Sequence, residues 1–152
     1  MQTKNRFLLI GGGVILTLLA IQVYKRRNMR LSKNFNWSEF ESKDGAPMPA
    51  DVKANIRRLV ENLEIIRAAL NSPIKITSGY RSPGHNASIP GSAKDSQHVK
   101  GTAADFSSPG YTPAQIGATI EKLIAAGKIS QGGMGIYPTW VHYDIRGKKA
   151  RW

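Results

Sequence analysis

The chain has 152 residues, which is enough for one domain with its own hydrophobic core and hardly enough for two. It contains no cysteine, which excludes disulfide bonds, thiolate metal ligands and cysteine nucleophiles. The net charge is +12, and residues 1–36 contribute +7 of it because they hold seven Lys and Arg and no Asp or Glu.

An uncharged stretch near the N-terminus is predicted to cross a membrane. Residues 7–24 read FLLIGGGVILTLLAIQVY, with basic residues on both sides. As a helix, this stretch would span roughly 27 Å, close to the hydrocarbon thickness of a bilayer. A core helix would need polar positions on its outer face, and this stretch has almost none. A cleaved signal peptide would need a small-residue cleavage site after the apolar run, and no such site is present there. We therefore expect an uncleaved anchor at residues 1–28, a linker at 29–36 and a folded domain at 37–152.

The first long element of the domain is predicted to be a helix from Ala50 to Leu70. Asn71-Ser72-Pro73 is expected to end it, and Ser38-Glu39-Phe40 is expected to form a short helical turn before it. The apolar residues of the helix recur mostly at spacings of three and four, and they are Val52, Ile56, Leu59, Val60, Leu63, Ile66 and Leu70.

Short strands and a long loop are predicted next. Residues 73–78 alternate apolar and polar side chains, which is typical of a strand, and Ala103–Phe106 suits a buried strand. The stretch 78–106 is rich in turn-forming residues and is predicted to be mostly loop. Long irregular loops inside compact domains are often functional.

A second helix and a final pair of strands complete the predicted fold. Thr112, Pro113 and Gln115 favour a helix start with a capping box, and Gly127 is expected to end this helix. Residues 134–146 are expected to form two short strands around a turn, and 148–152 a basic tail with no evident role. Together these elements predict an α+β fold, in which a small antiparallel sheet has flanking helices and follows one N-terminal transmembrane helix.

Two stretches hold residues that favour a metal site. His98 and Asp105 have Gly101 between them to let the backbone turn, and His142 lies in a late stretch that reads WVHYD. The chain has three histidines, and one lies close to a carboxylate in each of these stretches. Zinc prefers tetrahedral nitrogen and carboxylate ligands, and a catalytic site keeps one position open. The sequence therefore predicts a zinc hydrolase with His98, Asp105 and His142 as ligands.

These residues belong to a longer pattern that resembles a known family. The pattern SGYRS…HN…SQHxxGxAxDF, followed by WVHYD, is similar to that of the zinc D-alanyl-D-alanine carboxypeptidases and related peptidoglycan peptidases, including the VanX-like dipeptidases. The resemblance covers about residues 35–147 and implies the hedgehog/D,D-peptidase fold. His142 takes the place of the distant second histidine, and the family motif S-x-H-x-x-G-x-A-x-D is matched at Ser96, His98, Gly101, Ala103 and Asp105.

The resemblance implies roles for several residues. Zinc would lower the pKa of its bound water to about 7, and the resulting hydroxide would attack a peptide carbonyl. Arg81 matches the family arginine that contacts substrate near the scissile bond, where it would stabilise an oxyanion or orient the acyl oxygen. A structural bridge from the loop to a carboxylate is the alternative for this arginine. Ser96 would hydrogen-bond the substrate or His98, or would serve only in a turn.

The chain departs from this family at the position of the general base. Many members place Glu or Asp three residues before the second histidine ligand, or His two residues before it, whereas this chain has Thr139 and Trp140 there. Asp144 is the nearest replacement, because two residues beyond His142 on a strand it would face the same side. We predict that Asp144 is the base; it would otherwise orient His142 or pair with Arg146.

Two classes of function are consistent with this pattern. The first, which we favour, is a zinc peptidase that hydrolyses peptide stems or cross-links of bacterial peptidoglycan. It would act as a D,D-carboxypeptidase or as an endopeptidase. Such domains also occur in bacteriophage enzymes for lysis or host entry. The second is a non-catalytic zinc-containing module that binds the cell wall. The absence of Glu or Asp at position 139, where this chain has Thr139, favours this second class. The expected partners are peptidoglycan peptide, from the family resemblance, and a membrane, through the N-terminal helix. No nucleic acid is expected, because the sequence has no nucleic-acid-binding motif.

The chain is expected to be anchored in a membrane, with its catalytic domain facing the cell wall. The setting would be a bacterial envelope, or a phage membrane or virion. Positively charged flanks tend to stay on the cytoplasmic side, and the flank after residues 7–24 is the more basic one. That asymmetry favours the opposite orientation, but it is small because the preceding flank is also positive.

Overall fold

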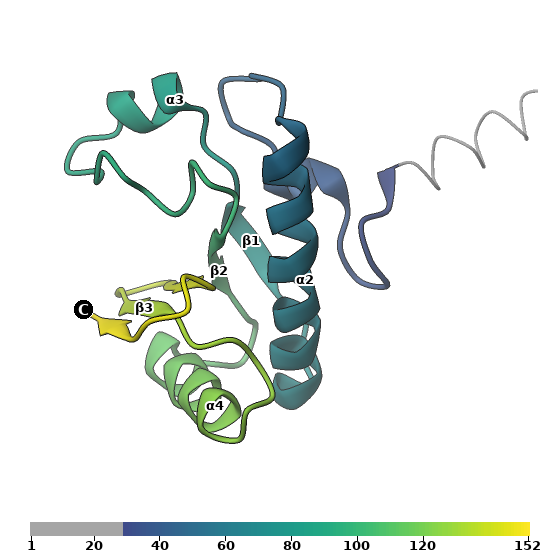
Figure 1. Ribbon diagram of the computed structural model, residues 1–152. Helices are drawn as coiled ribbons and strands as arrows, with labels where there is room; N and C mark the ends of the chain where they lie inside the picture. The colour runs from purple at the N-terminus through teal and green to yellow at the C-terminus, as the bar shows by residue number, and fades with distance from the viewer. Residues whose placement is uncertain (1–28) are drawn as a thin grey trace, which may run out of the picture.

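A five-stranded sheet with helices packed on it forms the folded part of the computed structural model, which describes residues 29–152. Figure 1 shows α2 running along β1 and β2, with α4 below β3. In chain order the elements are the 3-10 helix η1 (Trp37–Phe40), α2 (Ala50–Leu70), β1 (Lys75–Ser78), α3 (Pro83–Ser88), β2 (Ala103–Ser107), α4 (Pro113–Ala125), β3 (Gly133–Ile136), β4 (Val141–Asp144) and β5 (Ala150–Arg151).

The sheet has the strand order β1-β2-β4-β3-β5. The first three pairings are antiparallel, as the sequence predicted, whereas β3 and β5 pair in parallel. The α+β class is therefore confirmed, but the expectation of a purely antiparallel sheet was wrong. The reason is that residues 150–151, which were expected to belong to a tail, add a fifth strand at the edge beside β3.

The long helix α2 has the bounds that its apolar spacing predicted, and all seven apolar residues of the predicted pattern are buried. Asn71 ends the helix in the left-handed conformation, with φ of 46°. Helix α4 begins with the predicted capping box between Thr112 and Gln115. It ends at Ala125, two residues before Gly127, whose φ is +64°.

The core lies between these helices and one face of the sheet. Ala104 and Phe106 on β2 and Val141 and Tyr143 on β4 join the buried apolar side chains of α2 and α4. Because side chains alternate across a strand, the residues between them point to the opposite face of the sheet. That second face carries the polar residues Asp105, His142 and Asp144.

The stretch between β1 and β2 is mostly loop, as predicted, but it also contains the short helix α3. Ser82 caps this helix by accepting a hydrogen bond from the backbone N–H of His85, and Pro83 occupies its first turn. Ser-Pro at the start of a helix is a known signal, so α3 was detectable from the sequence. Figure 1 shows the loop and α3 at the same end of the sheet as the start of α2.

Residues 29–36, which were expected to be a linker, lie against α2. The side chains of Ser32 and Asn34 both donate hydrogen bonds to Glu64, and Phe35 is buried in the core. The predicted anchor at residues 7–24 lies outside the described residues. Within 29–152, no helix combines the length and the apolar character that crossing a membrane requires.

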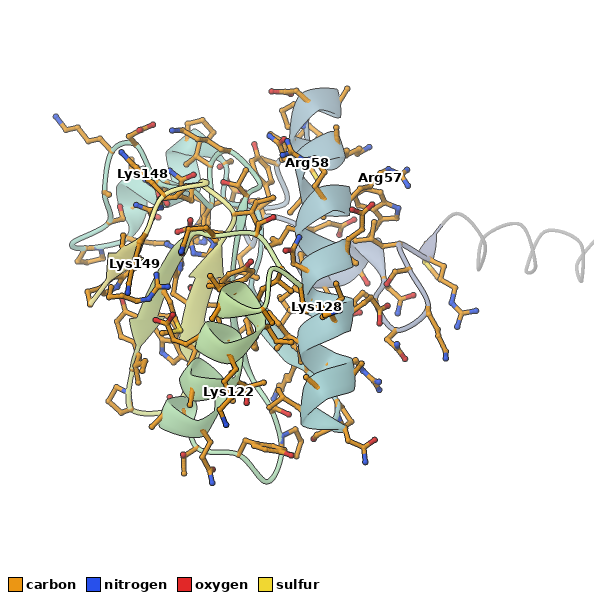
Figure 2. The ribbon with its side chains drawn as sticks, turned by 60° about the horizontal axis from the view of Figure 1, so that its bottom comes forward. Arg57, Arg58, Lys122, Lys128, Lys148 and Lys149 are labelled. Atoms are coloured by element: carbon orange, nitrogen blue, oxygen red, sulfur yellow. The ribbon has the colours of Figure 1, made fainter. Side chains whose placement is uncertain are left out.

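The basic side chains of the domain are spread over its surface. Figure 2 labels six exposed cations and shows them in separate regions of the surface, on α2, on and just after α4, and before β5. This distribution favours the interpretation of a solvated surface over a binding patch for an anionic polymer. The six residues are Arg57, Arg58, Lys122, Lys128, Lys148 and Lys149.

Candidate metal centre

The three predicted ligands meet on the polar face of the sheet. Asp105 on β2 lies directly opposite His142 on β4 in the strand register, and the loop before β2 brings His98 onto the same spot. One potential ligand atom of each residue lies within 4.8 Å of the others, and all three residues are buried. We refer to His98, Asp105 and His142 as the metal-ligand cluster.

The spacing inside the metal-ligand cluster fits a small tetrahedral ion. Nε2 of His98 lies 3.2 Å from Oδ1 of Asp105 and 3.3 Å from Nδ1 of His142. Nδ1 of His142 lies 2.9 Å from the same carboxylate oxygen. A zinc ion about 2.0–2.1 Å from each ligand would hold tetrahedral ligand atoms about 3.3 Å apart. The three atoms therefore have nearly the separations that a shared zinc ion would impose.

The outer nitrogen of His98 fixes which tautomer this histidine adopts. Nδ1 lies 2.7 Å from the carbonyl oxygen of Gly79, and it must donate because a carbonyl only accepts. The lone pair of neutral His98 is then on Nε2, which faces the cluster. A side chain at position 79 would meet the Cα of Phe40 at 2.6 Å, so glycine allows the close backbone approach that places this carbonyl.

Asp144 and Arg146 fix the tautomer of His142 in the same way. Nε2 of His142 donates to Oδ2 of Asp144 at 3.0 Å, which leaves the lone pair of neutral His142 on Nδ1 inside the cluster. Asp144 is fully buried. Its oxygens also accept hydrogen bonds from the Arg146 side chain at 2.6–3.0 Å and from the backbone N–H of Gly133 at 2.9 Å.

These contacts bear on the predicted role of Asp144 as the base. Asp144 binds the nitrogen of His142 that points away from the cluster, so it lies on the far side of the imidazole ring. Both of its oxygens are already occupied by donors. The geometry therefore supports the two alternatives considered for this residue, orientation of His142 and pairing with Arg146, over direct contact with an attacking water.

The charges of the metal-ligand cluster stabilise one another. Burial alone would raise the pKa of Asp105, but the hydrogen bonds that His142 and, in its protonated form, His98 donate outweigh burial and hold this pKa well below its ordinary value. Burial would lower the pKa of His142, but hydrogen bonds to Asp105 and Asp144 raise it above its ordinary value. In the metal-free protein, the proton on Nδ1 of His142 thus lies where a metal ion would bind.

Arg81 contacts the metal-ligand cluster through its carboxylate. Nη2 donates to Oδ2 of Asp105 at 2.7 Å, and Nε donates to Oγ of Ser78 at 3.0 Å. The guanidinium group occupies Oδ2, which leaves Oδ1 of Asp105 to face both histidines. This is the bridge from the loop to a carboxylate that was the alternative for Arg81. Nη1 makes no hydrogen bond to residues 29–152 and remains available as a donor.

Three further residues, Ser96, His85 and Trp140, do not belong to the metal-ligand cluster. Oγ of Ser96 accepts the backbone N–H of His98 at 3.3 Å, which is the turn role. His85 lies on α3 and belongs to no candidate metal group in the described part of the chain. Trp140, at one of the two positions where the family resemblance predicts a base, stacks on Tyr137 with ring centroids 3.7 Å apart.

Trp152 is the residue near the site that the sequence analysis missed. Its indole ring lies 5.2 Å from the His142 ring, centroid to centroid, and the Arg146 guanidinium lies 5.6 Å from the indole. The signal was weak, because a single tryptophan in a short basic stretch has no periodicity. The sequence offered only an aromatic residue in a segment that had no other assigned role.

The donor set of the metal-ligand cluster fits zinc. Two imidazole nitrogens and one carboxylate oxygen form a common three-ligand set for catalytic zinc, and hydrogen bonds to Gly79 and Asp144 set both histidines in the ligating form. Three protein ligands leave a fourth position for water or substrate. The cluster can therefore hold a metal ion that acts as a Lewis acid.

Comparisons with known proteins agree with this chemistry. A family model described as Peptidase M15 matches residues 32–144, a range that includes the whole metal-ligand cluster. A Haemophilus influenzae protein described as the probable peptidoglycan L,D-endopeptidase MepK is 32% identical over 96 residues. The aligned part covers 59% of this chain and 48% of that protein, so the chain spans about half the length of this relative.

Proposed function

The chain belongs to the peptidase M15 family, and we propose that it is a zinc-dependent endopeptidase that cleaves the peptides of bacterial peptidoglycan. The observation that carries the proposal is the convergence of three buried donor atoms whose outer partners, Gly79 and Asp144, set both histidines for metal binding. The described activity of the similar MepK protein supports peptidoglycan as the substrate and an internal peptide bond as the target.

His98, Asp105 and His142 would hold the ion, which when bound would supply Lewis-acid chemistry for the attack of water on a peptide carbonyl. Arg81 keeps Oδ1 of Asp105 directed at the histidines and offers Nη1 to the carbonyl oxygen of the substrate. Asp144 holds the His142 ring in place and keeps its proton on Nε2. In this proposal Asp144 is a positioning residue, and it acts through His142.

The three histidines allow a matched test of metal binding. We expect the purified chain to bind one equivalent of zinc and to lose it in His98→Ala and His142→Ala, because each change removes one of three ligands. His85→Ala is the control, since this histidine lies on α3 outside the metal-ligand cluster. Metal analysis of the four proteins measures the outcome. Equal zinc in all four would place the ion elsewhere.

Digestion of purified peptidoglycan tests the activity and the bond. We expect the zinc-loaded chain to release fragments that mass spectrometry identifies as products of internal peptide cleavage, and His142→Ala to release none. Release of single terminal D-alanine would instead identify a carboxypeptidase. Zinc binding without any cleaved bond would favour the alternative proposal of a non-catalytic module that binds the cell wall, which the absence of a carboxylate at Thr139 supports.

We also propose that residues 7–24 anchor the chain in a membrane and that the domain faces the cell wall. The uncharged length of this stretch supports an anchor, and a substrate in the wall would require the domain on that side. Protease added to membranes that keep their wall side outward tests the orientation. Digestion of the domain only after these membranes have been permeabilised would contradict the proposed orientation.

A further inference from the structure

The indole ring of Trp152 lies beside the metal-ligand cluster at a place that glycine leaves open. Gly135 pairs with His142 in the register of β3 and β4, so the two residues share the polar face of the sheet. A Cβ atom on residue 135 would lie 2.4 Å from Nε1 of Trp152. The indole therefore takes the space over Gly135 and contacts the edge of the cluster through His142, with the two rings tilted by 43°.

The orientation of this indole is fixed on several sides. Its Nε1–H donates to the hydroxyl of Tyr137 at 2.8 Å. The backbone of Trp152 pairs with β3, because its N–H donates to Met134 at 3.3 Å and its carbonyl accepts from Ile136 at 3.0 Å. The side chain is thus a rigid surface, and little further conformational entropy would be lost if a ligand stacked on it.

The indole is also unusually exposed for such a fixed ring. Trp152 is 52% exposed, whereas His142 against it is 7% exposed. Among the exposed large apolar side chains of residues 29–152, which are Met29, Ile65, Tyr111, Ile136 and Trp152, it alone contacts the metal-ligand cluster. An aromatic ring whose role was only to pack against His142 would not need to leave half of its area in water.

Resting on the proposed function, we propose that the exposed face of Trp152 positions the peptide substrate by stacking on its longest alkyl side chain. The one polar group of the indole is already satisfied by Tyr137, so the ring offers an apolar surface and no free donor. Peptidoglycan stem peptides combine small and acidic residues with one diamino acid. The methylene chain of that diamino acid is the largest apolar surface such a peptide presents.

Steady-state kinetics on two stem peptides tests this role. The peptides differ only in whether the diamino acid or alanine occupies that position. For Trp152→Ala we expect KM to rise about 10-fold on the diamino acid peptide and to change less than about 2-fold on the alanine peptide, with kcat nearly unchanged on both. Trp152→Phe keeps a stacking ring and should recover most of the loss in KM.

The control variant is Ile136→Ala, which removes a comparably exposed side chain whose tip lies near α4, on the other face of the sheet. It should leave both KM values unchanged. Zinc content is measured for every variant. A loss of zinc or of kcat in Trp152→Ala, with KM unchanged, would show that the indole serves only to pack His142, and an equal rise of KM on both peptides would remove the selectivity for the diamino acid.

A binding experiment separates failure of this inference from failure of the proposed function. Metal-free protein cannot turn over, so the indole N–H signals of the three tryptophans can be followed by NMR as the diamino acid peptide is added. We expect the Trp152 signal to shift and the Trp37 signal, from η1, to stay in place. A shift without hydrolysis by the zinc-loaded chain would contradict the proposed function alone. Hydrolysis without a shift would overturn the inference alone.

Discussion

Asp105 is the residue on which the candidate centre depends most. One of its oxygens faces both histidines and the other accepts Nη2 of Arg81. A carboxylate with both oxygens assigned cannot rotate freely, so its ligating oxygen is directed before any metal arrives. We therefore expect Arg81 to affect metal binding even though it is not one of the predicted ligands.

Replacing Arg81 with lysine tests this assignment. Lysine keeps the charge, but its single nitrogen cannot reproduce the planar fork in which Nε binds Ser78, Nη2 binds Asp105 and Nη1 is left as a further donor. We expect hydrolysis to fall about 100-fold and zinc affinity about 10-fold, because a carbonyl donor and the orientation of Asp105 are both lost. Kinetics and chelator competition measure the two effects.

The matched control for this change is Arg151→Lys. Arg151 also makes a two-point contact with a carboxylate, that of Glu121, but lies outside the metal-ligand cluster. Its replacement should leave zinc affinity and hydrolysis unchanged. If the two lysine variants behaved alike, the effect would come from general destabilisation.

Asp144→Asn distinguishes a positioning residue from a base. The amide keeps the size of the side chain but loses the charge that holds the His142 proton on Nε2. We expect zinc affinity to fall about 10- to 100-fold, with hydrolysis largely recovered at saturating zinc. If Asp144 were the base, hydrolysis would stay abolished when the site is full. Asp95→Asn, which changes an exposed carboxylate paired with Lys100, is the control.

At the scale of elements, the loop between β1 and β2 is held against α2 at Gly101. This glycine has φ of +68°, and a Cβ there would lie 2.7 Å from Cγ1 of Val52 and 2.9 Å from its carbonyl oxygen. The turn also brings the Gly101 N–H to the carbonyl of His98 at 3.2 Å. The position of a cluster residue therefore depends on how closely this turn packs on the helix.

Comparing two glycine variants separates strain from packing. Gly91 also has a left-handed φ, +74°, but a Cβ there would meet nothing within 4 Å. We expect Gly91→Ala to lower the free energy of unfolding by about 1 kcal/mol, the cost of φ alone. Gly101→Ala should cost about 3 kcal/mol because it also clashes with Val52. Urea unfolding measures both, and equal losses would contradict the packing argument.

Much of this organisation could be predicted from local sequence patterns. Helix α2 follows from its apolar spacing, and the start of α4 follows from Thr112 and Gln115. Strand β5 could not be predicted, because two residues carry no periodicity and their partner β3 is found only after the chain has folded. Trp152 was missed for the same reason, since its position depends on that pairing.

At the scale of the whole molecule, the two faces of the sheet have different roles. One face buries apolar side chains against α2 and α4, and the other holds the charged groups of the candidate centre. The residue types of the metal-ligand cluster could be predicted from the sequence. Their protonation could not, because it depends on the Gly79 carbonyl and on the far side of the His142 ring, which only the folded chain brings into place.

Because of this charged face, the metal-free protein should lose stability both when the pH falls and when it rises. Asp105 and Asp144 have pKa values lowered from the ordinary 3.8, so their contribution is present above that value and is lost as pH falls through their folded pKa values. His142 has a pKa raised from the ordinary 6.5, so its contribution is complete below that value and is lost as pH rises through the folded pKa. The metal-free protein should therefore be most stable between about pH 4 and 6.5.

Zinc should shift this optimum toward neutral pH. A zinc ion held by Nδ1 of His142 would replace the proton there, so it would compete with that proton and bind more tightly as pH rises. We expect the increase in Tm on adding saturating zinc to grow steadily from about pH 5 to pH 8. Thermal unfolding with chelator and with zinc across this range measures the increase, and His142→Ala should abolish it while His85→Ala preserves it. An increase that was constant across the range, or that grew on acidification, would show that zinc does not displace this proton.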